Sequence, residues 1–127
     1  MNKNLNIAIV GLGQIGIYLY NELIIKRREI ENKTGKIINI VALSAKNKNK
    51  KRRFKINKKI FFSNPLNIIK SKKIDILFEC VGLSDGISKK IVEKSLKNKI
   101  HVITPNKGLM AKHGDYLSKI AEKNEVS

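Results

Sequence analysis

The sequence predicts an α/β fold built on an incomplete, doubly wound parallel sheet of about four strands in the order 3-2-1-4. Short apolar runs rich in β-branched residues alternate along the chain with longer amphipathic segments, which is the pattern of β-α-β units. A glycine turn directly follows the first apolar run, and no internal repeat or Pro/Ser-rich linker divides the chain. We therefore expect residues 1–127 to form one domain.

Four apolar runs have the length and composition of buried parallel strands. A further short extended piece is expected at Ile60–Ser63. Because right-handed crossovers connect parallel strands, their carboxyl ends meet along one edge, and ligands bind there at the switch point between strands one and four. The four expected strands are Leu5–Val10, Ile37–Leu43, Ile74–Cys80 and Ile100–Thr104.

The segments between these strands have helical periodicity. After the glycine turn, Ile15, Leu19 and Leu23 are spaced four apart, and Gly35 ends this helix. Proline opens the next, shorter helix, because its missing N–H costs nothing in a first turn. The last helical region contains Gly114, where a break is expected. The expected helices cover residues 16–31, 65–71, 87–97 and 106–124.

The turn Gly11-Leu12-Gly13-Gln14-Ile15-Gly16 has the glycine spacing of a dinucleotide-binding turn and lies between a strand and a helix. The first glycine permits the tight turn, the second lets a diphosphate approach the backbone, and the third lets the helix pack on the strand. The helix N-terminus then offers N–H groups and a partial positive charge to the phosphates. We therefore expect a Rossmann-type site with Gly11, Gly13, Gln14, Ile15 and Gly16 as cofactor-binding residues.

The end of the second strand favours NADP over NAD as the cofactor. NAD enzymes of this fold place an Asp or Glu about 20 residues past the glycines, where it binds the ribose 2′-hydroxyl. Here no acidic residue occurs between Glu31 and Asp75, and the strand ends in Ser44, Ala45 and Lys46 before a basic loop at 45–59. A cation attracts a 2′-phosphate, so we expect these three residues to bind the cofactor, with Lys46 at the phosphate. Most other cations of the loop are expected to be solvated, and NAD stays open as the alternative.

The composition excludes several other classes of protein. Hydrophobic residues make up 42% of the chain, which argues against disorder, and no apolar run approaches the ~20 residues of a membrane helix. The N-terminus lacks a secretory pattern, and the single cysteine, Cys80, suits a reducing compartment. We expect a cytoplasmic protein with no membrane partner. No metal-ligand spacing is present, and no metal site is expected.

The formal net charge of +17 raises the question of a nucleic-acid partner. The cations are 23 Lys and only 4 Arg, and they accompany 21 Ile and 14 Asn. This combination is typical of AT-rich coding DNA, which explains the charge without a ligand. The basic loop contains one aromatic residue, Phe54, whereas single-strand binding relies on several stacking rings. We therefore expect no nucleic-acid partner, and binding through this loop is the least favoured alternative.

In the second half of the chain, Glu79 precedes a turn with Gly82, Ser84 and Gly86, and Thr104–Lys107 precedes His113-Gly114. These two segments resemble homoserine dehydrogenase. Glu79, followed by a turn with Gly82, Ser84 and Gly86, is similar to the acidic residue and glycine-rich turn after the third strand in that family. The segment Thr104–Lys107, followed by His113-Gly114, is similar to its Thr-Ala-Asn-Lys motif before His-Gly. With the early glycine turn and the Ser44–Lys46 segment, the resemblance spans nearly the whole chain. The departures are Pro105 and Gly108, where alanine is usual, and Leu83, where glycine is usual.

This resemblance implies the reversible NAD(P)-dependent oxidation of L-homoserine to L-aspartate 4-semialdehyde, on the way to threonine, methionine and isoleucine. It implies Lys107 as the catalytic residue, because a cation at this position can polarise a carbonyl or orient a developing alkoxide. The alternative is that Lys107 is a solvated residue at a helix start. The further cofactor-binding residues that it implies are Val81, Gly82, Ser84, Thr104, Asn106 and Lys107.

In this family a substrate and dimerisation domain follows the nucleotide-binding domain, and the full-length proteins are expected to be homodimers or larger. The sequence ends where a fifth strand is expected to begin. We therefore expect that C-terminal domain to be absent, the fourth strand to be an edge with unpaired backbone groups, NADP to bind weakly, and homoserine turnover to be negligible. Two alternatives remain open: a related two-domain dehydrogenase of the aspartate-dehydrogenase kind, and a non-catalytic dinucleotide-binding module.

Overall fold

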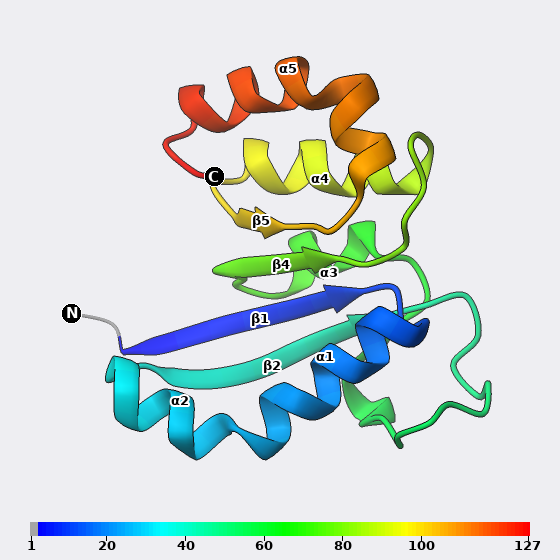
Figure 1. Cartoon of the computed structure of the whole chain (residues 1–127), viewed down its shortest axis with the longest axis vertical. Coiled ribbons are helices and arrows are strands. Elements are labelled where there is room, and N and C mark those ends of the chain that lie inside the picture. The colour runs from blue at the N-terminus through cyan, green and yellow to red at the C-terminus, as the bar shows by residue number, and fades with distance from the viewer. Residues whose placement is uncertain (1–2) are drawn as a thin grey trace.

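The computed structural model describes residues 3–127 and has a five-stranded parallel sheet with helices on both faces (Figure 1). The strands lie in the order β3-β2-β1-β4-β5. In chain order they are β1 (Asn4–Val10), β2 (Ile37–Ser44), β3 (Phe61–Phe62), β4 (Ile76–Glu79) and β5 (His101–Ile103). The helices are α1 (Gln14–Ile25), α2 (Arg27–Thr34), the 3-10 helix η1 (Lys58–Ile60), α3 (Leu66–Ser71), α4 (Ile87–Lys97) and α5 (Lys107–Lys123).

The predicted α/β class and the order 3-2-1-4 are confirmed, and β5 extends the sheet beyond β4. The strand count of about four is one too low. The expected extended piece at Ile60–Ser63 provides β3, so the run expected as the third strand is β4 and pairs with β1. Only Phe61 and Phe62 pair with β2, and a run of two residues has no detectable periodicity. The switch point therefore lies between β1 and β4.

The core consists of two clusters, one on each face of the sheet, because successive side chains of a strand point to opposite faces. Ile7 and Ile9 of β1 pack in one cluster with Ile17 and Tyr20 of α1. Ala8 and Val10 pack in the other with buried residues of α3, α4 and α5. In Figure 1, α1 and α2 run along β1 and β2, while α4 and α5 lie beside β5. The two faces are thus covered by different sets of helices.

Two helices differ from their expected form. The helix expected at residues 16–31 is two helices that meet at Lys26, although the hydrogen bonds continue from Lys26 N–H to the Glu22 carbonyl. The second, α2, is polar along its length and has no buried residue, so little packing holds it in line with α1. Conversely, α5 continues through Gly114 without the expected break. Leu109 and Leu117 are buried on either side of that glycine and hold the helix as one piece.

The sheet edge at β5 is partly paired, which corrects the expectation of an unpaired edge. The Val102 N–H donates to the Ser127 carbonyl at 2.8 Å, so the last residue of the chain lies beside this strand. Ile103, on the same strand, remains 50% exposed. Within residues 3–127 no helix is long and apolar enough to cross a membrane.

Candidate functional site

The glycine turn after β1 packs against the end of β4. Gly11 has a positive φ of 97°, and a Cβ added to it would lie 2.5 Å from the backbone carbonyl carbon of Cys80. A Cβ on Gly16 would overlap the carbonyl oxygen of Gly11. Both positions therefore exclude any side chain. The turn is also tied to β2, because the Gly11 N–H donates to the Ser44 carbonyl at 2.8 Å.

Gly13 differs from the two glycines that flank it in the motif. It has an ordinary φ of −72° and is the N-cap of α1, and no atom lies within 4 Å of a Cβ added there. No side chain caps the first turn of α1, so the helix N-terminus faces open space rather than a protein group. Open space at this point suits a bound diphosphate, whose oxygens accept hydrogen bonds from the first N–H groups of the helix.

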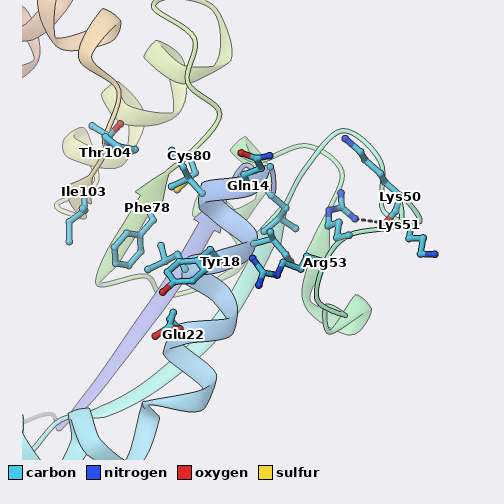
Figure 2. Close-up of a pocket in the computed structure, with 17 residues that line it drawn as sticks. Gln14, Tyr18, Glu22, Lys50, Lys51, Arg53, Phe78, Cys80, Ile103 and Thr104 are labelled. Atoms are coloured by element: carbon cyan, nitrogen blue, oxygen red, sulfur yellow. Dashed lines mark hydrogen bonds between the residues drawn. The ribbon is translucent and has the colours of Figure 1, made fainter.

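A cavity of about 970 Å³ lies at this N-terminus and extends along both sides of α1 (Figure 2). Figure 2 shows the side chains of Lys50 and Lys51 on one side of α1, and those of Phe78, Cys80 and Thr104 on the other. The cavity therefore has a basic rim and a largely apolar rim, with the glycine turn between them. Its lining residues are Leu12, Gly13, Gln14, Ile15, Ile17, Tyr18, Leu19, Glu22, Lys50, Lys51, Arg52, Arg53, Phe78, Cys80, Ile103, Thr104 and Pro105.

The basic rim is formed by four consecutive cations at residues 50–53. Arg52 folds this part of the loop around its guanidinium group, which donates to the carbonyls of Asn47 at 2.5 Å, Lys50 at 3.2 Å and Lys48 at 3.4 Å. Arg53 lies over the ring of Phe54, 5.2 Å from its centroid. The loop is thus an ordered basic segment.

The apolar rim contains the single cysteine of the chain. Burial, and secondarily the charge of Glu79, raises the pKa of the Cys80 thiol to about 11. At neutral pH this thiol is protonated, and a protonated thiol is a poor nucleophile. Cys80 therefore serves as a small half-buried side chain of the cavity wall.

Two turns border the apolar rim, one after β4 and one after β5, and a buried carboxylate joins them. Glu79, which is 0% exposed, accepts hydrogen bonds from Gly82 and Ser88 on the first turn and helix and from Thr104 and Asn106 on the second. Asn106 is also the N-cap of α5. Hydrogen bonds to Glu79 thus join the predicted residues Gly82, Thr104 and Asn106.

A second, exposed contact joins the first turn to α5. Asp85 forms an ion pair with Lys112, and its Oδ1 is hydrogen-bonded to Nε2 of His113 at 2.6 Å. Hydrogen bonding to Lys112 and then to His113 holds the pKa of the Asp85 carboxyl below its ordinary value. His113 lies inside α5 and faces this turn.

The cavity brings together some of the residues predicted from the sequence and leaves others outside its lining. Gly13, Gln14, Ile15 and Thr104 line it. Ile15 is 60% exposed because it faces this cavity, and it does not belong to the buried stripe of α1, which is formed by Gly16, Ile17 and Tyr20. The predicted residues outside the lining are Gly11, Gly16, Ser44, Ala45, Lys46, Val81, Gly82, Ser84, Asn106 and Lys107.

Three of the residues outside the lining are Ser44, Lys46 and Lys107. Ser44 is 1% exposed and pairs through its backbone with β1 and β3. Lys46 is exposed at the start of the loop, and Lys107 is exposed as the first residue of α5. Sequence reasoning chose Lys46 because it is nearest to the strand, whereas the loop places residues 50–53 at the cavity. The high density of cations in the loop was the signal in the sequence that pointed to a basic rim. It could not tell which cations reach the cavity, because the fold of the loop depends on the Arg52 contacts.

No group of three or more His, Cys, Asp or Glu side chains within the described residues could hold a metal ion.

Comparison with known proteins decides the family. A family model described as homoserine dehydrogenase, NAD binding domain, matches residues 11–127. The chain belongs to this family. The resemblance predicted from the two turns and the glycine motif is therefore confirmed, and dinucleotide binding is the property by which the family is described.

Individual homoserine dehydrogenases agree with this assignment. The enzyme of Neisseria gonorrhoeae is 32% identical over 124 residues, which cover 98% of this chain and 28% of that protein. A crystal structure of Staphylococcus aureus homoserine dehydrogenase at pH 7.5 matches with a TM-score of 0.90 and 34% identity, over 98% of this chain and 32% of that one. A hyperthermophilic archaeal homoserine dehydrogenase mutant in complex with NADPH, at 20% identity and a TM-score of 0.71, shares the fold. The chain thus spans less than a third of the length of the first two proteins.

Proposed function

We propose that residues 1–127 act as the NADP-binding domain of a homoserine dehydrogenase. The observation that carries this proposal is the open space at Gly13, where an uncapped helix N-terminus opens into a cavity with a basic rim. Gly11 and Gly16 are needed for packing, whereas the missing side chain of Gly13 serves nothing within the domain. A diphosphate accounts for that glycine, because it needs close approach to backbone N–H groups.

Each rim of the cavity is proposed to bind a different part of the cofactor. The 2′-phosphate of NADP is proposed to bind at the basic rim, through Lys50, Lys51 and Arg53, since charge-assisted hydrogen bonds to phosphate are the strong ones. The nicotinamide is proposed to lie at the other rim, beside Cys80 and Thr104, where the switch point of the sheet is. NAD lacks the 2′-phosphate and gains nothing from the cations, which is why NADP is the preferred cofactor.

The proposed reaction is the reversible oxidation of L-homoserine to L-aspartate 4-semialdehyde, in the biosynthesis of threonine, methionine and isoleucine. When bound, NADP supplies the acceptor for the hydride that leaves the alcohol carbon. Lys107, exposed at the start of α5, is proposed to orient the oxygen of the substrate, because a cation stabilises a developing alkoxide. The full-length enzyme is proposed to be a cytoplasmic homodimer or larger assembly.

A second candidate function is dinucleotide binding without catalysis by this chain. It is favoured by the position of Lys107, which lies outside the lining of the cavity. The two candidates differ in the turnover expected of a longer protein that contains this domain, and not in that of the 127-residue chain alone. With homoserine and NADP, the 127-residue chain is expected to show negligible oxidation, and sustained NADPH formation would instead assign catalysis to this domain.

The basic rim is tested by comparing NADPH and NADH in fluorescence titrations. The double variant Lys50→Ala/Arg53→Ala is expected to bind NADPH about tenfold more weakly, with NADH affinity changed less than about twofold. The control Lys70→Ala/Lys72→Ala removes the same charge from exposed positions outside the cavity lining and is expected to leave both affinities unchanged. Equal losses for the two cofactors in the first variant would contradict the assignment of the 2′-phosphate to this rim.

A further inference from the structure

Glu79 is a fully buried carboxylate at the carboxyl end of β4. Its Oε2 accepts hydrogen bonds from the Gly82 N–H at 2.9 Å and from the Ser88 hydroxyl at 3.0 Å. Its Oε1 accepts from the Thr104 hydroxyl at 2.6 Å and from the Asn106 side-chain amide at 3.2 Å. The two oxygens therefore hold two different segments: Oε2 the turn and helix after β4, and Oε1 the turn after β5.

Two of the four donors, Asn106 and Ser88, are themselves fixed by further hydrogen bonds within and between the two segments. The Asn106 amide also donates to the Leu83 carbonyl at 2.6 Å, and its Oδ1 accepts from the Leu109 N–H at 2.9 Å. The Ser88 hydroxyl accepts from the Leu83 N–H at 3.0 Å. The N–H and the carbonyl of Leu83 are thus both hydrogen-bonded to side chains that donate to Glu79. Removing the carboxylate would leave this network without its centre.

None of the four donors carries a positive charge. A buried carboxylate held only by neutral donors costs considerable desolvation free energy, whereas a polar neutral side chain can fill the same space at a smaller cost. Packing alone therefore does not explain a glutamate here. What a carboxylate provides, and an amide does not, is two acceptor oxygens that can each receive two donors.

The hydrogen-bond network of Glu79 lies next to the apolar rim of the cavity. Thr104 lines the cavity at its apolar rim, and Cys80, the residue after Glu79, lines it as well. The two segments that Glu79 joins are therefore the ones that border the proposed nicotinamide half. The glycine turn and the basic loop, which border the other half, have no hydrogen bond to Glu79 among the contacts described above.

We propose that Glu79 is a positioning residue that sets the two turns after β4 and β5 relative to each other and so shapes the nicotinamide half of the cofactor site. This inference rests on the proposed function and adds to it a residue that does not itself contact the cofactor. It separates the site into one half that depends on Glu79 and one half that does not.

Glu79→Gln is the sharpest variant, because it keeps the size of the side chain and removes one acceptor oxygen. The Gly82 N–H and the Asn106 amide donate to different oxygens, so one of them faces the new amino group in either orientation. Asn106 cannot turn its amide to compensate without losing the Leu109 N–H that its oxygen caps. Glu79→Gln therefore removes one of the hydrogen bonds through which residue 79 joins the two turns, while the side chain keeps its size and the contact of Asn106 with the Leu83 carbonyl remains.

The test titrates the 127-residue chain and its variants with NADPH and with 2′-phospho-ADP-ribose, which lacks the nicotinamide. Glu79→Gln is expected to weaken NADPH binding about tenfold, as a lost hydrogen bond to a charged group does, and to change 2′-phospho-ADP-ribose binding less than about twofold. The control Ser95→Ala alters a buried side chain whose hydroxyl has no partner, and both affinities are expected to stay unchanged. Ser88→Ala removes one donor to Glu79 with a milder effect on folding and is expected to weaken NADPH alone, about threefold.

Three outcomes would overturn the inference. Unchanged NADPH affinity in Glu79→Gln would show that the network does not shape the site. Equal losses for the two ligands would show a general structural role. If Glu79→Gln does not fold, unchanged NADPH affinity in Ser88→Ala overturns the inference in its place. Failure of the wild-type chain to bind either ligand would instead remove the proposed function, and this inference with it.

Discussion

Two glycines of the same turn serve different purposes, and substitution separates them. A Cβ on Gly16 would overlap the Gly11 carbonyl, so Gly16→Ala is expected to lower the free energy of unfolding by about 3 kcal/mol. A Cβ on Gly13 meets no atom within 4 Å, so Gly13→Ala is expected to cost at most about 1 kcal/mol, as an N-cap change. Gly13→Ala is nevertheless expected to weaken NADPH binding at least about tenfold, because the methyl group occupies the space of the diphosphate. Urea unfolding and NADPH titration of both variants measure the two effects, and full NADPH affinity in Gly13→Ala would contradict the site.

The Cys80 thiol offers a pH test of the cavity wall. Because its pKa is raised to about 11, the thiolate fraction at pH 8.5 is roughly a hundredfold smaller than that of a free cysteine. Alkylation by iodoacetamide is therefore expected to be slow at neutral pH and to rise tenfold per pH unit up to pH 10 without levelling. NADPH is expected to slow it further, since Cys80 lines the cavity. A rate that levels off near pH 8.5 would show an ordinary, exposed thiol.

At the scale of single residues, sequence alone was sufficient where a residue is required by backbone geometry. Gly11 and Gly16 could be assigned their roles in the turn because each role follows from a missing side chain. Ile15 was counted in the apolar periodicity of the first helix but is 60% exposed at the cavity, since periodicity does not tell which face of a helix the sheet leaves uncovered. The partners of Glu79 lie up to 27 residues away in the chain, and no local pattern encodes them.

Among the elements, the loop at 45–59 depends most on a single side chain. Arg52 donates to three carbonyls of this loop, and those contacts present its neighbours at the cavity. Arg52→Ala is expected to lower NADPH affinity about fivefold and NADH affinity little, with a melting temperature close to that of the wild type, because an exposed loop contributes little to stability. Titration with both cofactors, together with a thermal melt, measures this. A large drop in melting temperature would instead make Arg52 part of the core structure.

Helices and strands were predictable to the extent that they bury a regular apolar pattern. The four long runs became β1, β2, β4 and β5, whereas β3 has two residues and could be expected only as an extended piece. The bend at Lys26 and the continuity of α5 through Gly114 follow from tertiary packing, which local propensity does not contain. The order of the strands was predictable because handedness and short connections leave few alternatives.

At the scale of the whole molecule, the family and the fold followed from motifs that lie at the ends of strands. Their meeting point was predictable, because parallel strands bring their carboxyl ends together. The residues that form the basic rim were not predictable, since the path of a long loop is set by contacts such as those of Arg52. Of the cations behind the net charge of +17, those at residues 50–53 line the cavity, where the proposed function assigns them the 2′-phosphate.

The loop that carries the basic rim connects β2 to β3. In the order of the strands, these two lie on one side of β1, whereas β4 and β5, which precede the turns that Glu79 joins, lie on the other side. Between these two regions stand β1 and the glycine turn, which any dinucleotide would use in the same way. Under the proposed function, the choice between phosphorylated and unphosphorylated ribose depends on this surface loop alone. Grafting a loop with an acidic end into this place would redirect the domain toward NAD while leaving the opposite turns undisturbed.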